Sequence, residues 1–135
     1  MKKTFLVLVA SLAVFSFSSC EKCLKDCELI PAKVIRYDCD RVIFQLLTRE
    51  MLGDNTWTDV NNGQVYHNVV SYYNTCEIAA ITNGEYNTIY VKAEKTEQSH
   101  PVDECIQCQA ISNQPPVTKM IFKEISTEPC EPVID

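Results

Sequence analysis

The first twenty residues limit how much of this chain can enter a folded domain. Two lysines near Met1 precede an apolar run at residues 5–17, and Ser18 and Ser19 then stand directly before Cys20. A basic start, an apolar stretch and small residues, in this order, are typical of a secretory signal peptide. The run of 13 residues is too short to cross a bilayer, which takes about 20 apolar residues. We therefore expect residues 1–19 to be removed, leaving 116 of the 135 residues.

The position of Cys20 directly after the small residues predicts a lipoprotein cleavage site. In that case the Cys20 thiol carries diacylglycerol and Cys20 becomes the first mature residue, whereas an ordinary secreted protein cut after Ser19 is the alternative. Two or three acyl chains hold a protein stably on a bilayer, which makes the membrane the first expected partner. The charged, aperiodic segment behind the cysteine predicts a tether over residues 20–31 and a folded domain over residues 32–135.

The charge balance excludes one class of partner. The net charge of the full chain is -6, and it becomes -8 when Lys2 and Lys3 leave with the signal. A surface this acidic repels phosphate backbones, so nucleic acid is not an expected partner. The glycine motifs that bind nucleotides are also absent from the sequence, and no cofactor is expected.

Short apolar runs separated by turn residues predict an all-β domain. Residues 41–48 carry apolar side chains on both faces of an extended chain and predict a strand buried on both sides. A helix over residues 41–52, capped by Asp40 and ended by Gly53, is the alternative. The segment Asn61-Asn62-Gly63 predicts a hairpin between strands at 57–60 and 64–73. Further strands are expected at 33–37, at 87–94 with one face buried, and at 118–125.

Five or six strands without a long amphipathic helix favour a small barrel or sandwich, and an open five-stranded barrel is the first choice. The ending Phe17-Ser18-Ser19-Cys20 and the segments 33–39, 42–47, 68–70, 89–91, 105–108 and 120–122 carry a further likeness. In these residues the chain resembles a group of small Bacteroidetes-type lipoproteins, among which a Phe/Leu-Ser-Ser-Cys ending is common. The resemblance implies an OB-like β-barrel and an outer-membrane location, periplasmic or surface-exposed, and it implies no activity.

The cysteines that remain besides Cys20 predict disulfide bonds, because an exported domain meets an oxidising compartment. Seven cysteines remain, which is an odd number, so one thiol is left over or joins a second chain. About 105 pairings are open. A link between the Cys39 turn and the loop of Cys105 and Cys108 is favoured, because both lie at strand ends where a disulfide would tie a loop to the barrel. The disulfide candidates are Cys23, Cys27, Cys39, Cys76, Cys105, Cys108 and Cys130.

Two other roles are open to the cysteines. Cys105 and Cys108 have the spacing of a thiol redox motif, although the acidic pair Asp103-Glu104 disfavours a reactive thiolate there. Together with Cys23 and Cys27 they could supply four sulfurs to zinc. Export favours disulfides over both, so no bound metal is expected and redox chemistry or zinc binding stays an alternative.

Little in the sequence predicts catalysis. His67 and His100 are the only histidines, and the nucleophile motifs GxSxG and SxxK are absent. Residues 59–63 are similar to the start of a calcium loop, but the twelfth position from Asp59 is Val70 where such a loop has Glu, so they predict a turn. No catalytic residue is expected, and the protein is not expected to be an enzyme.

The aromatic residues are the candidates for ligand binding. Adjacent Tyr72 and Tyr73 point to opposite faces of a strand, so the aromatics cannot all lie in one core. Packing in the core and the hairpin is one interpretation, since strands favour aromatics. The other is a stacking platform on one barrel face for oligosaccharides or extended ligands. We therefore expect a non-enzymatic binding or structural module whose partners are a glycan or an envelope protein. The candidates for ligand contact are Trp57, Tyr66, Tyr72, Tyr73 and Tyr90.

Overall fold

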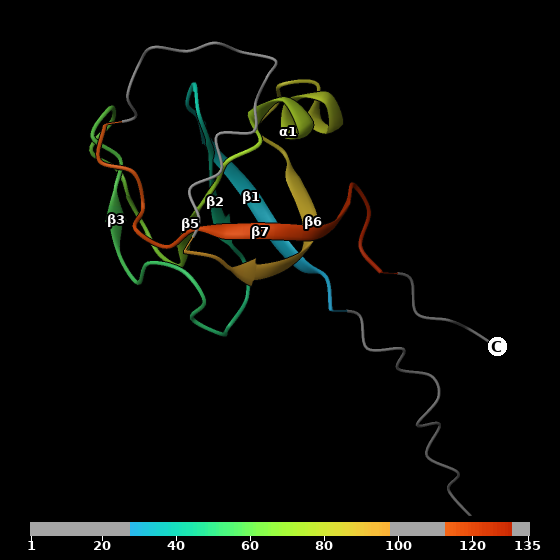
Figure 1. Ribbon diagram of the computed structural model, residues 1–135. Helices are drawn as coiled ribbons and strands as arrows, with labels where there is room; N and C mark the ends of the chain where they lie inside the picture. The colour runs from blue at the N-terminus through green and yellow to red at the C-terminus, as the bar shows by residue number, and fades with distance from the viewer. Residues whose placement is uncertain (1–27, 98–112, 131–135) are drawn as a thin grey trace, which may run out of the picture.

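The domain is built on one curled antiparallel sheet (Figure 1). The computed structural model describes residues 28–97 and 113–130. The sheet has the strand order β5-β2-β1-β6-β7, and a separate two-stranded sheet is formed by β3 and β4. The elements are β1 (Ile30–Tyr37), β2 (Val42–Leu46), β3 (Trp57–Thr58), β4 (Val65–Tyr66), β5 (Val69–Tyr72), α1 (Thr75–Thr82), β6 (Thr88–Lys95) and β7 (Met120–Ser126).

The two outermost strands of the sheet approach each other without closing a barrel. Ser71 of β5 forms a parallel bridge with Lys119, just before β7, and its backbone N–H donates to the carbonyl of Thr118 at 2.9 Å. The Ser71 hydroxyl also donates to the carbonyl of Pro116 at 3.2 Å. In Figure 1, β7 crosses in front of β1 and β2 because the sheet is strongly curled. The expected all-β character and five strands are confirmed, and the sheet is open between β5 and β7.

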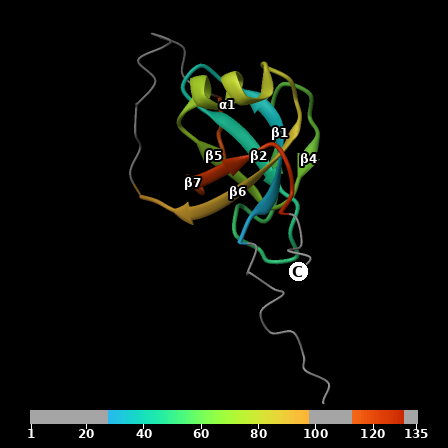
Figure 2. The ribbon, with the colours of Figure 1, turned by 90° about the vertical axis from the view of Figure 1, so that its right-hand side faces the viewer.

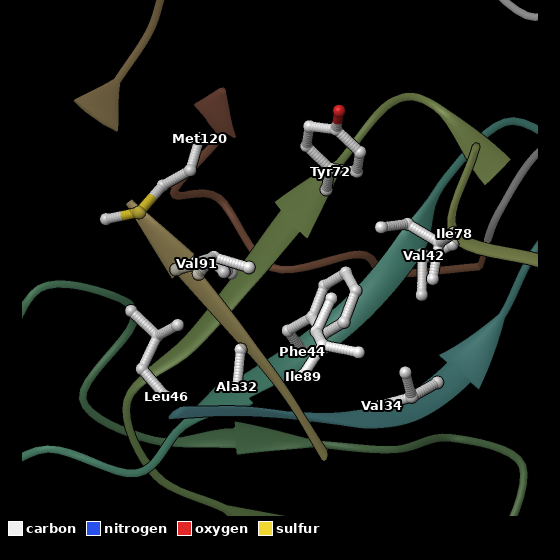
Figure 3. Packing of buried hydrophobic residues seen from close by; sticks show 11 residues of the cluster. Ala32, Val34, Val42, Phe44, Leu46, Tyr72, Ile78, Ile89, Val91 and Met120 are labelled. Carbon is white, nitrogen blue, oxygen red and sulfur yellow. The ribbon is translucent and has the colours of Figure 1, made fainter. Parts of the chain in front are cut away.

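The concave side of the sheet encloses the main apolar core (Figure 3). Alternate residues of each strand point inward, as the period of two in a β-strand requires. The ring of Phe122 stacks on Tyr72 with centroids 4.3 Å apart and meets Phe44 edge-on at 5.2 Å. The buried members of this core are Ala32, Val34, Val42, Phe44, Leu46, Val70, Tyr72, Ile78, Ile89, Val91 and Met120.

A second, smaller apolar cluster lies on the outer side of β2 and β5. Ile43 and Val69 are fully buried there against Trp57 of the β3–β4 hairpin, and Ile35 and Tyr66 complete the contact. The hairpin therefore covers a face of the sheet that would otherwise meet water. The prediction that the segment after Arg41 is a strand buried on both sides is confirmed, and the alternative helix is wrong because residues 42–45 pair with both β1 and β5.

The Asn-Gly segment forms the predicted hairpin. Trp57 pairs with Tyr66 and Thr58 with Val65, and Gly63 has φ of 72°, a left-handed conformation that glycine adopts without strain. The strand expected at 64–73 is divided into β4 and β5 because Asn68, at φ 57°, turns the chain between them.

Helix α1 was not expected from the sequence. The side chain of Asn74 accepts a hydrogen bond from the Glu77 N–H at 3.2 Å, and Asn83, at φ 55°, ends the helix. This start and this end are ordinary capping signals. They are hidden by the β-branched residues between them and by a length of only eight residues. Ile78 inserts from α1 into the main core. Within residues 28–97 and 113–130, no helix has the length and apolar character needed to span a membrane.

The folded domain begins slightly earlier than expected. Ile30 and Pro31, the last two residues of the predicted tether, belong to β1 and pair with Val91 and Tyr90 of β6. The apolar side chain of Ile30 packs against the main core, and this contact stabilises the strand as far as this residue. The prediction of a half-buried strand after Asn87 is confirmed, since Ile89 and Val91 are buried and Tyr90 is not.

Candidate functional site

The aromatic residues proposed for ligand binding are placed at four separate positions. Trp57 and Tyr66 lie together on the hairpin, with ring centroids 6.2 Å apart. Tyr72 belongs to the main core, and its hydroxyl donates to Glu77 Oε2 at 2.6 Å. Tyr73 and Tyr90 are half-buried on other parts of the surface. The five residues do not form one continuous stacking platform.

Trp57 uses its ring and its N–H within the protein. Its side chain is only 7% exposed, and Nε1 donates to the carbonyl of Gln114 at 2.8 Å. The guanidinium of Arg36 lies 5.2 Å from the centre of the indole ring, a cation–π contact. This tryptophan therefore packs the hairpin against the sheet and leaves little ring surface for a ligand.

Arg36 is the centre of a buried ionic cluster that the sequence analysis did not find. Its Nε and Nη2 donate to the two carboxylate oxygens of Asp38 at 2.8 and 2.9 Å, and Nη1 donates to Asp59 Oδ1 at 2.6 Å. Nη2 also reaches the carbonyl of Asn113 at 3.3 Å. Burial lowers the pKa of Arg36, but hydrogen bonds and charges from the two aspartates outweigh it, so the pKa is raised above its ordinary value.

The turn at residues 59–63 is organised by the same aspartate. The Asp59 carbonyl accepts from the Gly63 N–H at 2.7 Å, and Oδ1 accepts from the Asn61 N–H at 3.0 Å as well as from Arg36. The prediction of a turn here is confirmed. The carboxylate joins β1 to the hairpin across 23 residues, so no local sequence pattern could have indicated the pair.

Tyr73 is the predicted aromatic with the most ligand-like surroundings. Its ring lies 4.6 Å from the guanidinium of Arg41 and 5.9 Å from Lys119 Nζ. Arg41 is also paired with the carboxylate of Asp40, through Nε at 3.0 Å; burial lowers its pKa, but the charge and hydrogen bonds of Asp40 raise it above its ordinary value. A hollow of about 350 Å³ adjoins Lys119. It is lined by Lys95, Thr96, Glu97, Val117, Thr118 and Lys119.

This arrangement suits an anionic group. Two cations lie beside a tyrosine ring, and the hollow next to Lys119 is lined by two ammonium groups, two hydroxyl groups and one carboxylate, that of Glu97. The excess of positive groups attracts an anion, and the ring adds a polarisable surface. The volume lies at the lower end of the range for small-molecule sites. A carboxylated sugar ring is one ligand class that such a surface could hold.

The cysteines divide between the described domain and the rest of the chain. Cys39, Cys76 and Cys130 are disulfide-bonded, and none of the cysteines in the described part is a free thiol. Cys39 lies in the turn between β1 and β2, and the start of α1 lies beside this turn, where the Thr75 hydroxyl donates to the Asp38 carbonyl at 3.4 Å. The other predicted positions, which lie outside the described residues, are Cys20, Cys23, Cys27, Cys105 and Cys108.

Histidine and acidic side chains of the described part show no grouping suited to a metal. His67 is exposed, and its Nδ1 lies 2.9 Å from the Asn55 carbonyl. Among residues 28–97 and 113–130, no three His, Cys, Asp or Glu side chains are placed to hold one ion. His100 lies outside this part.

Asp54 is a second carboxylate whose role the sequence did not predict. It accepts hydrogen bonds from the Thr118 N–H and hydroxyl at 2.9 and 2.6 Å, and so it ties the start of β7 to the hairpin side of the domain.

The chain matches no protein-family model, no curated protein and no solved structure.

Proposed function

We propose that the protein is a lipid-anchored module of the cell envelope that binds or supports other envelope components and catalyses no reaction. Cys20 carries the lipid, the outer membrane is the site of anchoring, and the domain from Ile30 onward is the working part. The resemblance of residues 17–20 to the ending of Bacteroidetes-type lipoproteins supports this proposal.

The observation that carries the proposal is the place where the sheet begins. β1 starts at Ile30, ten residues after Cys20. An extended chain covers at most about 3.5 Å per residue, so the first strand lies within about 35 Å of the anchor. A domain on so short a connection works at the membrane surface. The disulfides at Cys39, Cys76 and Cys130 add support, because such bonds persist in exported proteins.

An OB-like architecture is part of the proposal. The strand order β5-β2-β1-β6-β7, the helix between β5 and β6 and the parallel bridge between Ser71 and Lys119 fit a five-stranded, partly open barrel. In OB folds the face of the second and third strands binds ligands. Here the corresponding strands are β2 and β5, and the hairpin covers their outer face. A ligand would therefore bind beside the hairpin.

The test is the intact mass of protein extracted from membranes, with thiols alkylated before and after reduction. We expect a chain that starts at Cys20 and carries two or three acyl chains, with its other thiols mostly protected until reduction. The variant Cys20→Ala is the matched control and should lose the acyl mass and the membrane association together. An unacylated wild-type protein, or one cleaved at another residue, would contradict the proposal.

Glycan binding is a second candidate function, favoured by the surroundings of Tyr73. The cations of Arg41 and Lys119 beside its ring suit acidic sugars. Retention on a column of immobilised uronic-acid polysaccharide should weaken about tenfold in Tyr73→Ala, which corresponds to about 1.4 kcal/mol. Tyr90→Ala, on the outer side of β6, is the control that should bind normally. Equal retention of both variants, or no retention of the wild type on such a column, would count against this function.

A further inference from the structure

The loop at residues 47–53, between β2 and the hairpin, is held in one conformation by a buried asparagine. Asn68 is 4% exposed. Its Oδ1 accepts from the N–H groups of Leu52 and Gly53 at 2.9 and 2.8 Å, and Nδ2 donates to the carbonyls of Leu46 and Glu50 at 3.2 and 2.9 Å. All four hydrogen-bonding positions of the amide are thus used, three on this loop and one on the last residue of β2.

Gly53 fixes the far end of the loop. A Cβ atom at this residue would lie 2.5 Å from the carbonyl oxygen of Val69, so only glycine lets the chain pass this close to β5. Asp54, the next residue, donates its N–H to the same carbonyl at 2.8 Å. The loop is therefore held at its far end by the backbone of β5 and along its length by the side chain of Asn68.

This well-held loop exposes apolar side chains. Leu47 is 46% exposed and Met51 is 51% exposed, and exposed Arg49 lies between them in sequence. Leu52, by contrast, packs against the main core. Two exposed apolar side chains within five residues of one held loop form a candidate contact surface, whereas single ones scattered over a protein do not.

The loop lies where the chain enters the domain. The Leu47 N–H donates to the carbonyl of Pro31 at 2.8 Å, next to the first residue of β1. In Figure 1 this loop is at the lower end of the molecule, together with the start of β1, and α1 is at the upper end. Figure 2 shows the same separation after a quarter turn.

We propose that Leu47, Arg49 and Met51 contact the surface of the bilayer that carries the lipid on Cys20. This inference rests on the proposed function, because the anchor brings this end of the domain to the membrane. A connection of at most about 35 Å keeps the loop within reach of the lipid headgroups. Leucine and methionine gain from insertion at the boundary with the acyl chains, while arginine places its charge among phosphates. Glu50 balances the charge of Arg49, so apolar insertion is the main attraction.

The experiment places a fluorescent reporter at each end of the domain. Acylated Met51→Trp and Tyr86→Trp are reconstituted into vesicles of phosphatidylethanolamine and phosphatidylglycerol that contain brominated phosphatidylcholine, which quenches nearby tryptophan. Tyr86 is 60% exposed and contacts Tyr37 at the other end of β1, so it is the matched control. Wild-type protein supplies the background of buried Trp57.

We expect the added tryptophan of Met51→Trp to be quenched at least about twofold more than that of Tyr86→Trp and to emit at shorter wavelength. Adding Leu47→Glu to Met51→Trp should abolish the excess quenching. Leu47→Trp is a second reporter in case Met51→Trp does not fold, as judged by circular dichroism.

The two levels of the proposal fail in different ways. Acylated Met51→Trp or Leu47→Trp with the same quenching as Tyr86→Trp would overturn the membrane contact and leave the lipid anchor intact. A wild-type protein without acyl mass would overturn the anchor and, with it, this inference.

Discussion

The two sides of the five-stranded sheet are stabilised differently. On the concave side, Phe44 and its neighbours form a core in which burial of apolar surface is the main stabilising effect. On the convex side, the hairpin adds only a few apolar contacts around Trp57, and a buried arginine with two aspartates completes the attachment. A small sheet that does not bury both faces by apolar packing can thus hold a covering hairpin through polar contacts between residues distant in sequence.

The largest expected effect is in the concave core. Phe44→Ala removes a fully buried ring and leaves a cavity, which should lower the free energy of unfolding by about 3–5 kcal/mol. This is a large part of the stability of a small domain. Urea denaturation with the disulfides intact measures it. Leu47→Ala, one residue past β2 and exposed, should cost less than about 1 kcal/mol. Equal losses would mean that the core is not the main source of stability.

On the convex side, a substitution of Arg36 should lower the free energy of unfolding nearly as much as Phe44→Ala does. Arg36→Ala leaves Asp38 and Asp59 without their cation and should cost about 3 kcal/mol. Arg36→Lys should recover only part of this lost stability, because an ammonium group cannot reproduce the bidentate contact with Asp38. The raised pKa of Arg36 keeps the guanidinium charged through the alkaline range, so urea denaturation at pH 7 and pH 9 should give the same loss.

A second arginine, just before β2, gives the comparison for this cluster. The Arg41 side chain is about as buried as that of Arg36, but its partner Asp40 is a sequence neighbour with a partly exposed carboxylate, so Arg41→Ala should lower the free energy of unfolding by only about 1 kcal/mol. A loss at Arg36 no greater than this would show that the hairpin is held by apolar contact alone.

A smaller effect is expected from the indole N–H. Trp57→Phe keeps an aromatic ring on Ile43 and Val69 but removes the hydrogen bond to Gln114 and weakens the contact with Arg36. We expect it to lower the free energy of unfolding by about 1–2 kcal/mol. Thermal unfolding followed by circular dichroism measures it. Tyr66→Phe, which loses only an exposed bond to Gln64, should change stability by less than about 0.5 kcal/mol.

The smallest effect is expected on the outward side of the hairpin. Val65 is half-exposed, so Val65→Thr should change the free energy of unfolding by less than about 0.5 kcal/mol. The midpoint of urea denaturation at two protein concentrations gives the measurement. A larger loss that depends on concentration would show that a second copy of the chain covers the hairpin.

Local patterns predicted the parts of the fold that local physics controls. The alternation at residues 42–46 indicated a strand buried on both faces, and Asn61-Asn62-Gly63 indicated the hairpin. Both rest on interactions within a few residues, namely side-chain alternation and a left-handed glycine. Helix α1 was missed because Thr75, Ile78 and Thr82 favour strands, and its burial against the core overrides that preference.

The candidate site could be predicted only as a set of residue types. The aromatics were recognised, but the sequence could not show that Trp57 and Tyr72 are used in packing while Tyr73 lies close to two cations. Arg36 and Asn68 were missed for the same reason. Asp59 is 23 residues from Arg36, and the four backbone partners of Asn68 are 15 to 22 residues away, and hydrogen bonds over such separations leave no periodic signal.

The sequence by itself determined the strands, the hairpin and the expectation of an export signal with Cys20 at its end, because each depends on neighbouring side chains. The tertiary structure alone decided that the hairpin covers β2 and β5, that Arg36 joins Asp59, and that Leu47 and Met51 remain exposed beside the start of β1. These features depend on which distant surfaces exclude water from each other, and that is settled only when the sheet curls and brings them together.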